Sequence, residues 1–325
     1  ATSPSEHLVT ALPGLPDGAL GTKHYAGYIP VTEGFQFYWL FESAGSDPDH
    51  DPLVIWLNGG PGCSSMDGLW LENGPLRVDD DHHVTINPYS WHNVANMLYV
   101  DQPLGTGLSY TTTENYADND TQVIDSQFHL FLSNFLKLHS GYMASGSRSR
   151  PIYFTGESHA GHYIPSMIAH IFKTNEAVDR GDDQDGIILD VRGMAIGNGW
   201  LDPVNQYDVS DFAFGMGLID GGQRRAMKRK ADTCVASVKS GNYQTSICLS
   251  LMDEIVADSG GGGHGVPRVS MYDVRNFESG RDFPPGHRAV ESYLNRDDVR
   301  KAVHASSCPI AFQECTDPPY RHLAK

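Results

Sequence analysis

Five short apolar runs are spaced along the first two thirds of the chain, and each predicts a β-strand: residues 36–42, 53–57, 97–100, 152–155 and 191–196. Several of these runs are continuous rather than alternating, which is typical of a parallel sheet covered on both faces. Residues 122–139 and 162–175 predict helices that alternate with the strands. This order predicts an α/β fold with a central, mostly parallel sheet.

The pattern changes after the fifth predicted strand. Residues 202–290 are first helical and then rich in glycine and proline, with an unbroken serine and glycine run at 259–263. Such a segment predicts a helical cap with a glycine-rich loop, inserted into the α/β core. A helix predicted at residues 293–304 returns the chain to the core. We therefore expect an N-terminal core part at 1–201, the cap, and the return to the core at 291–325.

A single serine lies at the centre of a small-residue turn that follows the fourth predicted strand. The turn reads Gly156-Glu157-Ser158-His159-Ala160, and a helix is predicted directly after it. A strand, a sharp turn and a helix form the context that a serine nucleophile needs, because the turn lifts its hydroxyl clear of the sheet. Alanine stands at the fifth position, where the general form of this turn has glycine. The alternative is an ordinary strand-to-helix turn with a capping serine.

The strand at 53–57 also runs into a glycine-rich loop, Asn58-Gly59-Gly60-Pro61-Gly62. Glycines allow backbone N–H groups to point toward one place, as stabilisation of a tetrahedral oxyanion requires. In hydrolases of this type one donor is the amide after the nucleophile, here His159. The other comes from an earlier loop, where Gly60 is the candidate. The alternative is a tight structural turn.

These two loops belong to a larger set of motifs, at residues 56–65, 87–91, 101–110, 156–161 and 196–200. On these motifs the chain resembles, over nearly its whole length, the serine carboxypeptidases of the carboxypeptidase Y and cathepsin A type. The resemblance implies the α/β-hydrolase fold. Four stretches look most like the fungal, pheromone-processing Kex1-type branch, which trims basic residues from processed peptides: residues 12–16, 105–107, 197–200 and 271–275.

The resemblance implies a role for the residues of the serine turn and the glycine loop. Ser158 would be the nucleophile, and the backbone N–H groups of Gly60 and His159 would form the oxyanion hole. The family usually has tyrosine at position 159. The backbone donor survives that change, and a histidine side chain there is expected to titrate near neutral pH.

The resemblance also implies a site for the free carboxylate at the end of a peptide. Asn58, Gly59 and Glu157 would hold this carboxylate, with Glu72 paired to Glu157. Two close carboxyl groups do not both ionise cheaply, so one retains a proton that it can donate to the substrate carboxylate. Activity is therefore expected to favour acidic pH. The alternatives are a solvated helix acid at Glu72 and a turn residue at Glu157.

The family's catalytic aspartate and histidine lie in motifs near its C-terminus, and neither motif is present in this chain. His264 lies in a Gly-His-Gly-Val-Pro stretch, but this stretch falls within the predicted cap and is not expected to supply the base. We expect a second chain or a missing C-terminal segment to carry both residues. A truncated chain and a catalytically incomplete relative that only binds are the alternatives.

The predicted function is a serine-type carboxypeptidase that removes C-terminal residues from peptide substrates through an acyl-enzyme. Asp67 lies near the place where the family shapes its leaving-residue pocket, and it is a candidate for recognising lysine or arginine. The alternative for Asp67 is a surface acid in the first turn of a helix. The same chemistry supports acyl transfer from ester donors, so an acyltransferase is the second candidate function. The resemblance implies no cofactor.

Five cysteines are present, without the Cys-x-x-Cys or histidine-ligand spacing that predicts a metal site. The resemblance implies a disulfide between Cys63 and Cys315. Cys234 and Cys248 are expected to form a local bridge within the cap. Cys308 is then left over, either free or paired with a cysteine in the missing segment.

The composition indicates the cellular compartment of the protein and the classes of molecule that it binds. The chain has 325 residues, 40% of them hydrophobic, and a formal net charge of −17. This acidity argues against nucleic acid and anionic membranes as partners and favours basic peptide substrates. No apolar run is long enough to span a membrane. The cysteine pairs and a glycosylation sequence at Asn119 predict passage through the secretory pathway, whether to the outside, a vacuole or lysosome, or the Golgi.

Overall fold

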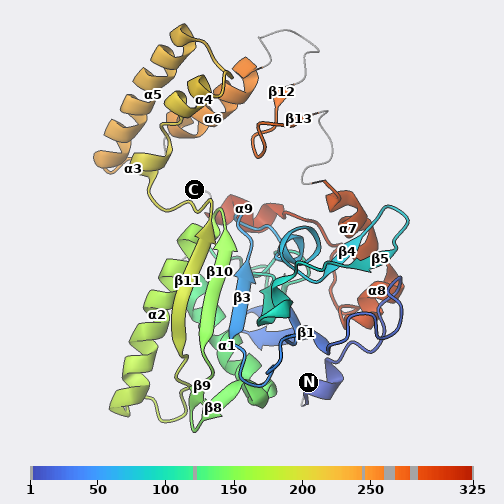
Figure 1. The fold of residues 1–325 in the computed structure, drawn as a ribbon. Helices are drawn as coiled ribbons and strands as arrows, with labels where there is room; N and C mark the ends of the chain where they lie inside the picture. Colours follow the sequence, from blue (N-terminus) through green and yellow to red (C-terminus); the bar gives the residue numbers. More distant parts are fainter. Residues whose placement is uncertain (1–2, 120–122, 244–245, 260–267, 279–284, 324–325) are drawn as a thin grey trace. The chain divides into compact units, whose positions relative to one another are not determined.

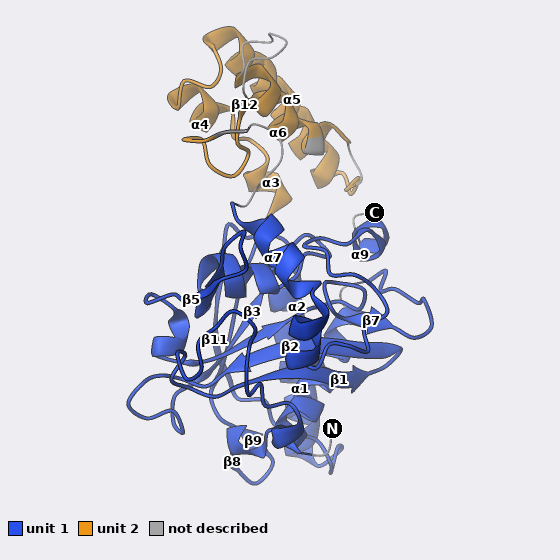
Figure 2. Ribbon diagram, turned by 90° about the vertical axis from the view of Figure 1, so that its right-hand side faces the viewer, with its two compact units in different colours: residues 1–199, 283–325 blue, residues 200–282 orange. Residues whose placement is uncertain are grey.

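A computed structural model of the chain describes residues 3–119, 123–243, 246–259, 268–278 and 285–323. The chain forms two compact units, which are residues 1–199 with 283–325 and residues 200–282 (Figure 2). The first unit is an α/β core and the second is mainly helical.

A seven-stranded mixed sheet organises the core unit (Figure 1). Its strands are β1 (His24–Val31), β2 (Gly34–Phe41), β6 (Asn96–Val100), β3 (Leu53–Leu57), β10 (Ile152–Glu157) and β11 (Val191–Gly197), in this spatial order, with the short β7 (Tyr110–Thr111) beside β2. β6, β3, β10 and β11 run parallel to one another, whereas β2 pairs antiparallel with both β1 and β6. The mostly parallel sheet is as the sequence predicts.

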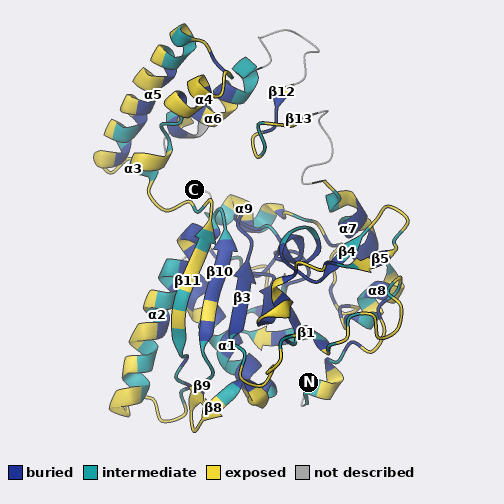
Figure 3. Cartoon of the chain, viewed as in Figure 1, coloured by how far each residue is buried: buried dark blue, intermediate teal, exposed yellow. Residues whose placement is uncertain are grey.

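The central strands are continuous apolar runs because both faces of the sheet are buried (Figure 3). In β2, Phe37, Trp39 and Phe41 belong to the apolar cluster on one face, and Tyr38 and Leu40 belong to the cluster on the other. Successive side chains of a strand point to opposite faces. A strand covered on both faces therefore needs an apolar residue at every position.

Two long helices cover one face of the sheet. α1 (Asp125–Leu138) buries Phe128, Phe131 and Phe135, which recur at the three- and four-residue spacing of a single helix face. α2 (Ala160–Arg180) packs against α1 and against β10. The apolar side chains of both helices join those of the sheet in one cluster.

Three short elements, η2 (Gly68–Glu72), α7 (His287–Leu294) and α8 (Asp297–Ala302), contribute side chains to the apolar cluster on the other face. Trp70 of η2 and Tyr293 of α7 are completely buried, and their rings meet edge to face with centroids 5.2 Å apart. The last segment of the core unit therefore packs on the segment that follows β3. The expected domain boundary between residues 290 and 291 falls inside α7.

The five predicted strands are present with small shifts at their ends, and α2 extends beyond the predicted range of 162–175. The single helix predicted at 293–304 is wrong, because the chain forms α7 and α8 with a break between them. Asn295 makes this break by bonding to the backbone of Phe312, with its amide donating to the carbonyl at 2.9 Å and its oxygen accepting from the N–H at 2.7 Å. Arg296 is extended, with ψ of 138°. A contact with a segment distant in sequence thus ends the first helix.

The remaining short elements of the core unit are η1 (Pro4–Glu6), β4 (Leu76–Val78), β5 (Val84–Ile86), η3 (Trp91–Asn93), η5 (Ser140–Tyr142), β8 (Met143–Ser145), β9 (Arg148–Ser149) and α9 (Asp317–Leu323). No helix in the described part of the chain combines the length and the apolar character needed to cross a membrane.

The second unit is built around α5 (Gly221–Lys239), with α3 (Pro203–Gln206), α4 (Ser210–Gly215), α6 (Ser246–Ser259) and the hairpin of β12 (Arg268–Val269) and β13 (Phe277–Glu278). Asp220 caps α5 in a capping box with Gln223. A disulfide between Cys234 and Cys248, which the sequence led us to expect, joins α5 to α6.

His24 makes folding of the core unit sensitive to pH. Its Nδ1 atom accepts a hydrogen bond from the indole N–H of Trp39 at 3.0 Å, and burial lowers the pKa of His24 to about 4. An unfolded histidine has a pKa of about 6.5. The stability that depends on neutral His24 is therefore complete above pH ~6.5 and is lost as the pH falls toward 4.

We expect the free energy of unfolding to fall on the order of 2 kcal/mol between about pH 7 and about pH 4.5 through this residue alone. In His24→Gln the side-chain oxygen still accepts from Trp39 but does not titrate, so the pH dependence should be smaller. Urea unfolding at both pH values measures the difference. Equal losses in the two proteins would contradict the role given to His24.

Candidate active site

The serine turn lies between β10 and α2. Ser158 has a φ of +56°, a left-handed conformation that is strained for any residue with a side chain, and its N–H donates to the carbonyl of Gly197 at 3.0 Å. A Cβ atom at Gly156 would lie 2.3 Å from the carbonyl oxygen of Leu57 and 2.9 Å from the methyl of Ala160. Glycine at 156 therefore makes room for alanine at the fifth position of the turn.

The glycine loop after β3 packs directly against this turn. A Cβ atom at Gly59 would lie 2.4 Å from the backbone nitrogen of His159 and 2.9 Å from the Cβ of Ser158. Within the described ranges, no acceptor takes a hydrogen bond from the backbone N–H of Gly60 or of His159. Free N–H groups beside a serine hydroxyl are what an oxyanion hole offers. The fold thus places the two predicted loops in contact.

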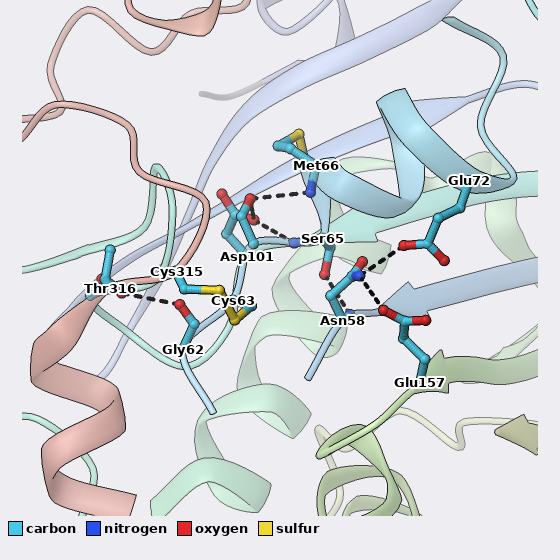
Figure 4. Close-up of a disulfide and its surroundings, with 12 residues drawn as sticks. Asn58, Gly62, Cys63, Ser65, Met66, Glu72, Asp101, Glu157, Cys315 and Thr316 are labelled. Carbon is cyan, nitrogen blue, oxygen red and sulfur yellow. Dashed lines mark hydrogen bonds between the residues drawn. A yellow bond between two sulfur atoms is a disulfide. The ribbon is translucent and has the colours of Figure 1, made fainter. Parts of the chain in front are cut away.

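The side chain of Asn58 lies between two carboxyl groups (Figure 4). Its amide nitrogen donates to Glu72 at 3.0 Å and to Glu157 at 3.1 Å. Its oxygen accepts from the indole N–H of Trp56 at 2.7 Å and from the backbone N–H of Gly68 at 3.1 Å. Because both of these partners can only donate, the orientation of the amide is unambiguous and its NH₂ group faces the carboxyl groups.

The two carboxyl groups are shifted toward their protonated forms. Burial raises the pKa of Glu72 to about 7, and the negative charge of Glu157 adds to the shift. Burial also raises the pKa of Glu157, against the opposing effect of the hydrogen bond from Asn58. The pair therefore holds a proton at mildly acidic pH, and this proton lies beside the serine turn. Glu72 is therefore not a solvated helix acid, and it lies close to Glu157 because both carboxyl groups accept from the same amide nitrogen.

One disulfide and two backbone hydrogen bonds attach the glycine loop to a segment near the end of the described chain. Cys63 forms a disulfide with Cys315, the pairing implied by the family resemblance (Figure 4). The backbone N–H of Thr316 donates to the carbonyl of Gly62 at 2.9 Å, and that of Ser64 donates to the carbonyl of Glu314 at 2.7 Å. The loop is therefore held from both sides of the disulfide.

Asp101 is a further anchor that the sequence did not single out. It is fully buried at the end of β6 and accepts from the Ser64 hydroxyl at 2.6 Å, the Ser65 N–H at 3.0 Å and the Leu108 N–H at 2.8 Å. Burial raises its pKa to about 6 even though these donors favour the ionised form. The sequence signal for this anchor was the position of Asp101 directly after an apolar strand, at the start of the motif at 101–110.

Asp67 is not a surface acid. It is 6% exposed, and no N–H or hydroxyl in the described part of the chain donates to its Oδ1 atom. Burial, and then the charge and hydrogen bonding of the Glu314 carboxyl group, hold the pKa of Asp67 well above its usual range. Burial raises the pKa of Glu314 as well. Glu314, which supplies the second carboxyl group, directly precedes Cys315 and is far from Asp67 in the sequence. The pair was therefore not predictable from the sequence position of Asp67.

The expectation that the His159 side chain titrates near neutral pH is wrong. Its ring stacks on that of His162, with centroids 4.7 Å apart and planes 5° apart, and meets the ring of Tyr163 edge to face. Burial and then the nearby His162 lower the pKa of His159 to about 4. The side chain is therefore neutral over most of the physiological range.

No hydrogen bond to the Ser158 hydroxyl is found among the residues that the structure describes, and His264 lies outside them. Cys308 is buried and forms no disulfide. Asn119 is exposed, and the rest of its glycosylation sequence lies outside the described residues. No three His, Cys, Asp or Glu side chains in those ranges are grouped so that they could hold a metal ion.

The family model described as serine carboxypeptidase matches residues 13–324 of this chain. The chain belongs to the serine carboxypeptidase family. The resemblance drawn from the motifs is thereby confirmed.

Similar proteins include the pheromone-processing carboxypeptidase KEX1 of Phytophthora infestans, which is 41% identical over 99% of this chain and 54% of its own length. Serine carboxypeptidase S10 family member 2 of Dictyostelium discoideum is 38% identical over 97% of this chain and 56% of its own length. The chain thus spans about half the length of the curated relatives it matches.

The crystal structure of Kex1(delta)p, a prohormone-processing carboxypeptidase from Saccharomyces cerevisiae, has a TM-score of 0.86 and 27% identity to this chain. The match covers 99% of this chain and 73% of the yeast structure. It confirms the α/β-hydrolase fold and the similarity to the Kex1-type branch.

Proposed function

We propose that this chain supplies the nucleophile, the oxyanion hole and the carboxylate site of a serine carboxypeptidase. One observation carries the proposal, namely the Asn58 amide held between two largely buried carboxyl groups beside the serine turn. This arrangement offers the proton of a carboxyl pair to a free carboxylate, and Glu157 directly precedes the serine in the chain. A serine hydrolase whose substrates have no terminal carboxylate does not need this arrangement of one amide and two carboxyl groups.

The reaction follows from these positions. The Ser158 oxygen attacks the carbonyl carbon of the last peptide bond, and the N–H groups of Gly60 and His159 receive the negative oxygen. A base takes the serine proton and passes it to the nitrogen of the departing amino acid. Water then attacks the acyl-enzyme and gives a proton to the base, which passes it to the serine oxygen as the bond to the shortened peptide breaks.

The aspartate and histidine that complete this machinery come from a segment or chain outside the described residues. The exposed edge of the core sheet supports this proposal. β11 pairs only with β10 among the strands described, and Met194 of β11 is 56% exposed. An unpaired apolar strand at the edge of a parallel sheet is a ready template for a further strand.

Covalent labelling tests the proposed nucleophile. We expect a fluorophosphonate to label Ser158 in the purified native protein and to leave Ser158→Ala unlabelled, with peptide mapping by mass spectrometry as the readout. The same spectra should contain the polypeptide that carries the base. Absence of labelling in a preparation that contains the base would contradict the proposal.

Release of free amino acids from peptides separates this function from acyl transfer. Both reactions form the same acyl-enzyme and differ only in the acceptor. A carboxypeptidase releases the C-terminal residue of a peptide, whereas an acyltransferase turns over ester donors alone. The first result is the one we expect.

The raised pKa of Glu72 predicts how activity depends on pH. The protonated pair donates to the substrate carboxylate, and the ionised pair repels it, so KM should rise as the pH rises through about 7. Glu72→Gln keeps a donor at all pH values and should give a nearly flat KM with a similar kcat. Steady-state kinetics on one peptide between about pH 5 and about pH 8 measure this. A wild-type kcat/KM that rises steadily over the range would rule the idea out.

The Asp67 and Glu314 pair supports a preference for basic leaving residues. A lysine or arginine side chain could replace the proton that the two carboxyl groups otherwise need. We expect Asp67→Asn to lower the ratio of kcat/KM for C-terminal lysine over leucine about tenfold or more, since a hydrogen bond to a charged group contributes about 1.5–3 kcal/mol. Asp297→Asn in α8 is the matched control. An unchanged ratio would remove Asp67 from the pocket.

Two structural features support a place in the secretory pathway. The disulfides Cys63–Cys315 and Cys234–Cys248 form in oxidising compartments. Asn119 is exposed, as a glycosylated asparagine must be.

A further inference from the structure

A shallow hollow in the second unit is lined mainly by basic side chains. It measures about 460 Å³ and is lined by Phe214, Gly221, Arg224, Arg225, Lys228 and Arg229. None of these lining residues is acidic, in a chain whose formal net charge is −17. The helix that carries most of them, α5, has six basic residues and one acidic residue. The local charge is therefore opposite to that of the chain.

The basic side chains point outward because of how α5 packs. Met227, Ala231 and Cys234 are buried in the apolar cluster of the second unit. Arg225 and Arg229 lie two positions before and after Met227, and a two-residue step on an α-helix leads to the opposite side. Both arginines are exposed. Their side chains do not take part in holding this unit together.

Two of the four cations are already paired. Arg224 bonds to Asp211 at 2.7 Å and lies over the ring of Phe214, with its guanidinium 5.0 Å from the ring centroid. Lys228 bonds to Asp208 at 2.5 Å. These contacts fix the wall of the hollow on the side of α4.

Arg225 and Arg229 form no ion pair with any carboxylate that the structure describes. The acid that interacts with the charge of Arg225 is the helix cap, Asp220. Its pKa is lowered by the backbone N–H groups of Gln223 and Gly222 and, to a smaller extent, by Arg225. Because the cap carboxylate is engaged by those N–H groups, the guanidinium group of Arg225 remains available.

We propose that this hollow binds a short acidic peptide segment, with carboxylates on Arg225 and Arg229. The two arginines are one helical turn apart, a rise of about 6 Å. Carboxylates two residues apart on an extended peptide lie on the same side, about 6.7 Å apart. The planar fork of arginine binds a carboxylate through two parallel hydrogen bonds. Phe214 is 42% exposed and offers an apolar contact beside them.

The net charge of the chain favours a short peptide over a large polyanion. A membrane surface or a nucleic acid would face the remaining acidic surface as well as the hollow, and a charge of −17 repels both. A segment that spans only two arginines avoids most of that repulsion. The site involves none of the residues proposed for catalysis, so it goes beyond the carboxypeptidase function.

Fluorescence anisotropy with a labelled, C-terminally amidated (Glu-Ser)₄ peptide tests this site on the intact chain. The amide removes the terminal carboxylate, so binding does not depend on the proposed active site. We expect saturable binding that is stronger than for (Gln-Ser)₄ and weaker at high salt. Arg225→Gln with Arg229→Gln should weaken it about tenfold or more. Lys173→Gln with Lys239→Gln makes the same change in net charge away from the hollow and should leave binding within about twofold.

A second double variant separates charge from geometry. Arg225→Lys with Arg229→Lys keeps both charges and loses the fork, so its affinity should fall between those of the wild type and the glutamine variant. Thermal unfolding of each variant checks its fold, and these exposed positions should leave the Tm nearly unchanged. Equal weakening by both glutamine pairs, no preference for glutamate over glutamine, or tighter binding to phosphatidylserine vesicles than to the peptide would overturn the proposal.

Discussion

The hydrogen bonds of the Asn58 side chain are the constraint on which the site depends. Trp56 and the N–H of Gly68 occupy the oxygen of this amide, so its nitrogen is directed at Glu72 and Glu157. Glu72 belongs to the segment after β3, and Glu157 is the last residue of β10, directly before Ser158. The amide therefore joins two loops that are about 100 residues apart in the chain. It also brings together two acids that share a proton at mildly acidic pH.

The surrounding structure keeps these loops in place through buried polar groups and one covalent link. Asp101 receives three donors at 2.6–3.0 Å, two of them from the residues directly after Cys63. The disulfide to Cys315 attaches the same loop to the end of the described chain. Removing a buried acceptor such as Asp101 leaves its donors unsatisfied, which costs about 1–3 kcal/mol for each buried group. The loop that carries the free Gly60 amide is therefore held by contacts made entirely outside the reacting atoms.

Electrostatics divide the protein into regions with different tasks. The chain as a whole is strongly acidic, and its buried acids near the serine turn are shifted toward neutrality. The second unit carries a basic face on α5, where two arginines have no partner among the described residues. A negative field favours cationic substrates at long range, whereas the arginines select for anions only at contact. The two effects act at different distances and so do not cancel.

Local sequence determined the strands, the long helices, the serine turn and the glycine loop, because apolar periodicity and small residues at turns act over a few positions. The break at Asn295, the burial of Asp67 and the neutral His159 were not predictable in this way. The break depends on the backbone of Phe312. The raised pKa of Asp67 depends on burial and then on the carboxyl group of Glu314, and the low pKa of His159 depends on burial and then on the nearby His162. The sequence alone therefore determined which residues carry the nucleophile, the backbone donors and the carboxyl groups. Only the tertiary structure decided which residues share a proton, which are buried away from water and which are in contact. These properties depend on distances in space, which the order of residues along the chain does not specify.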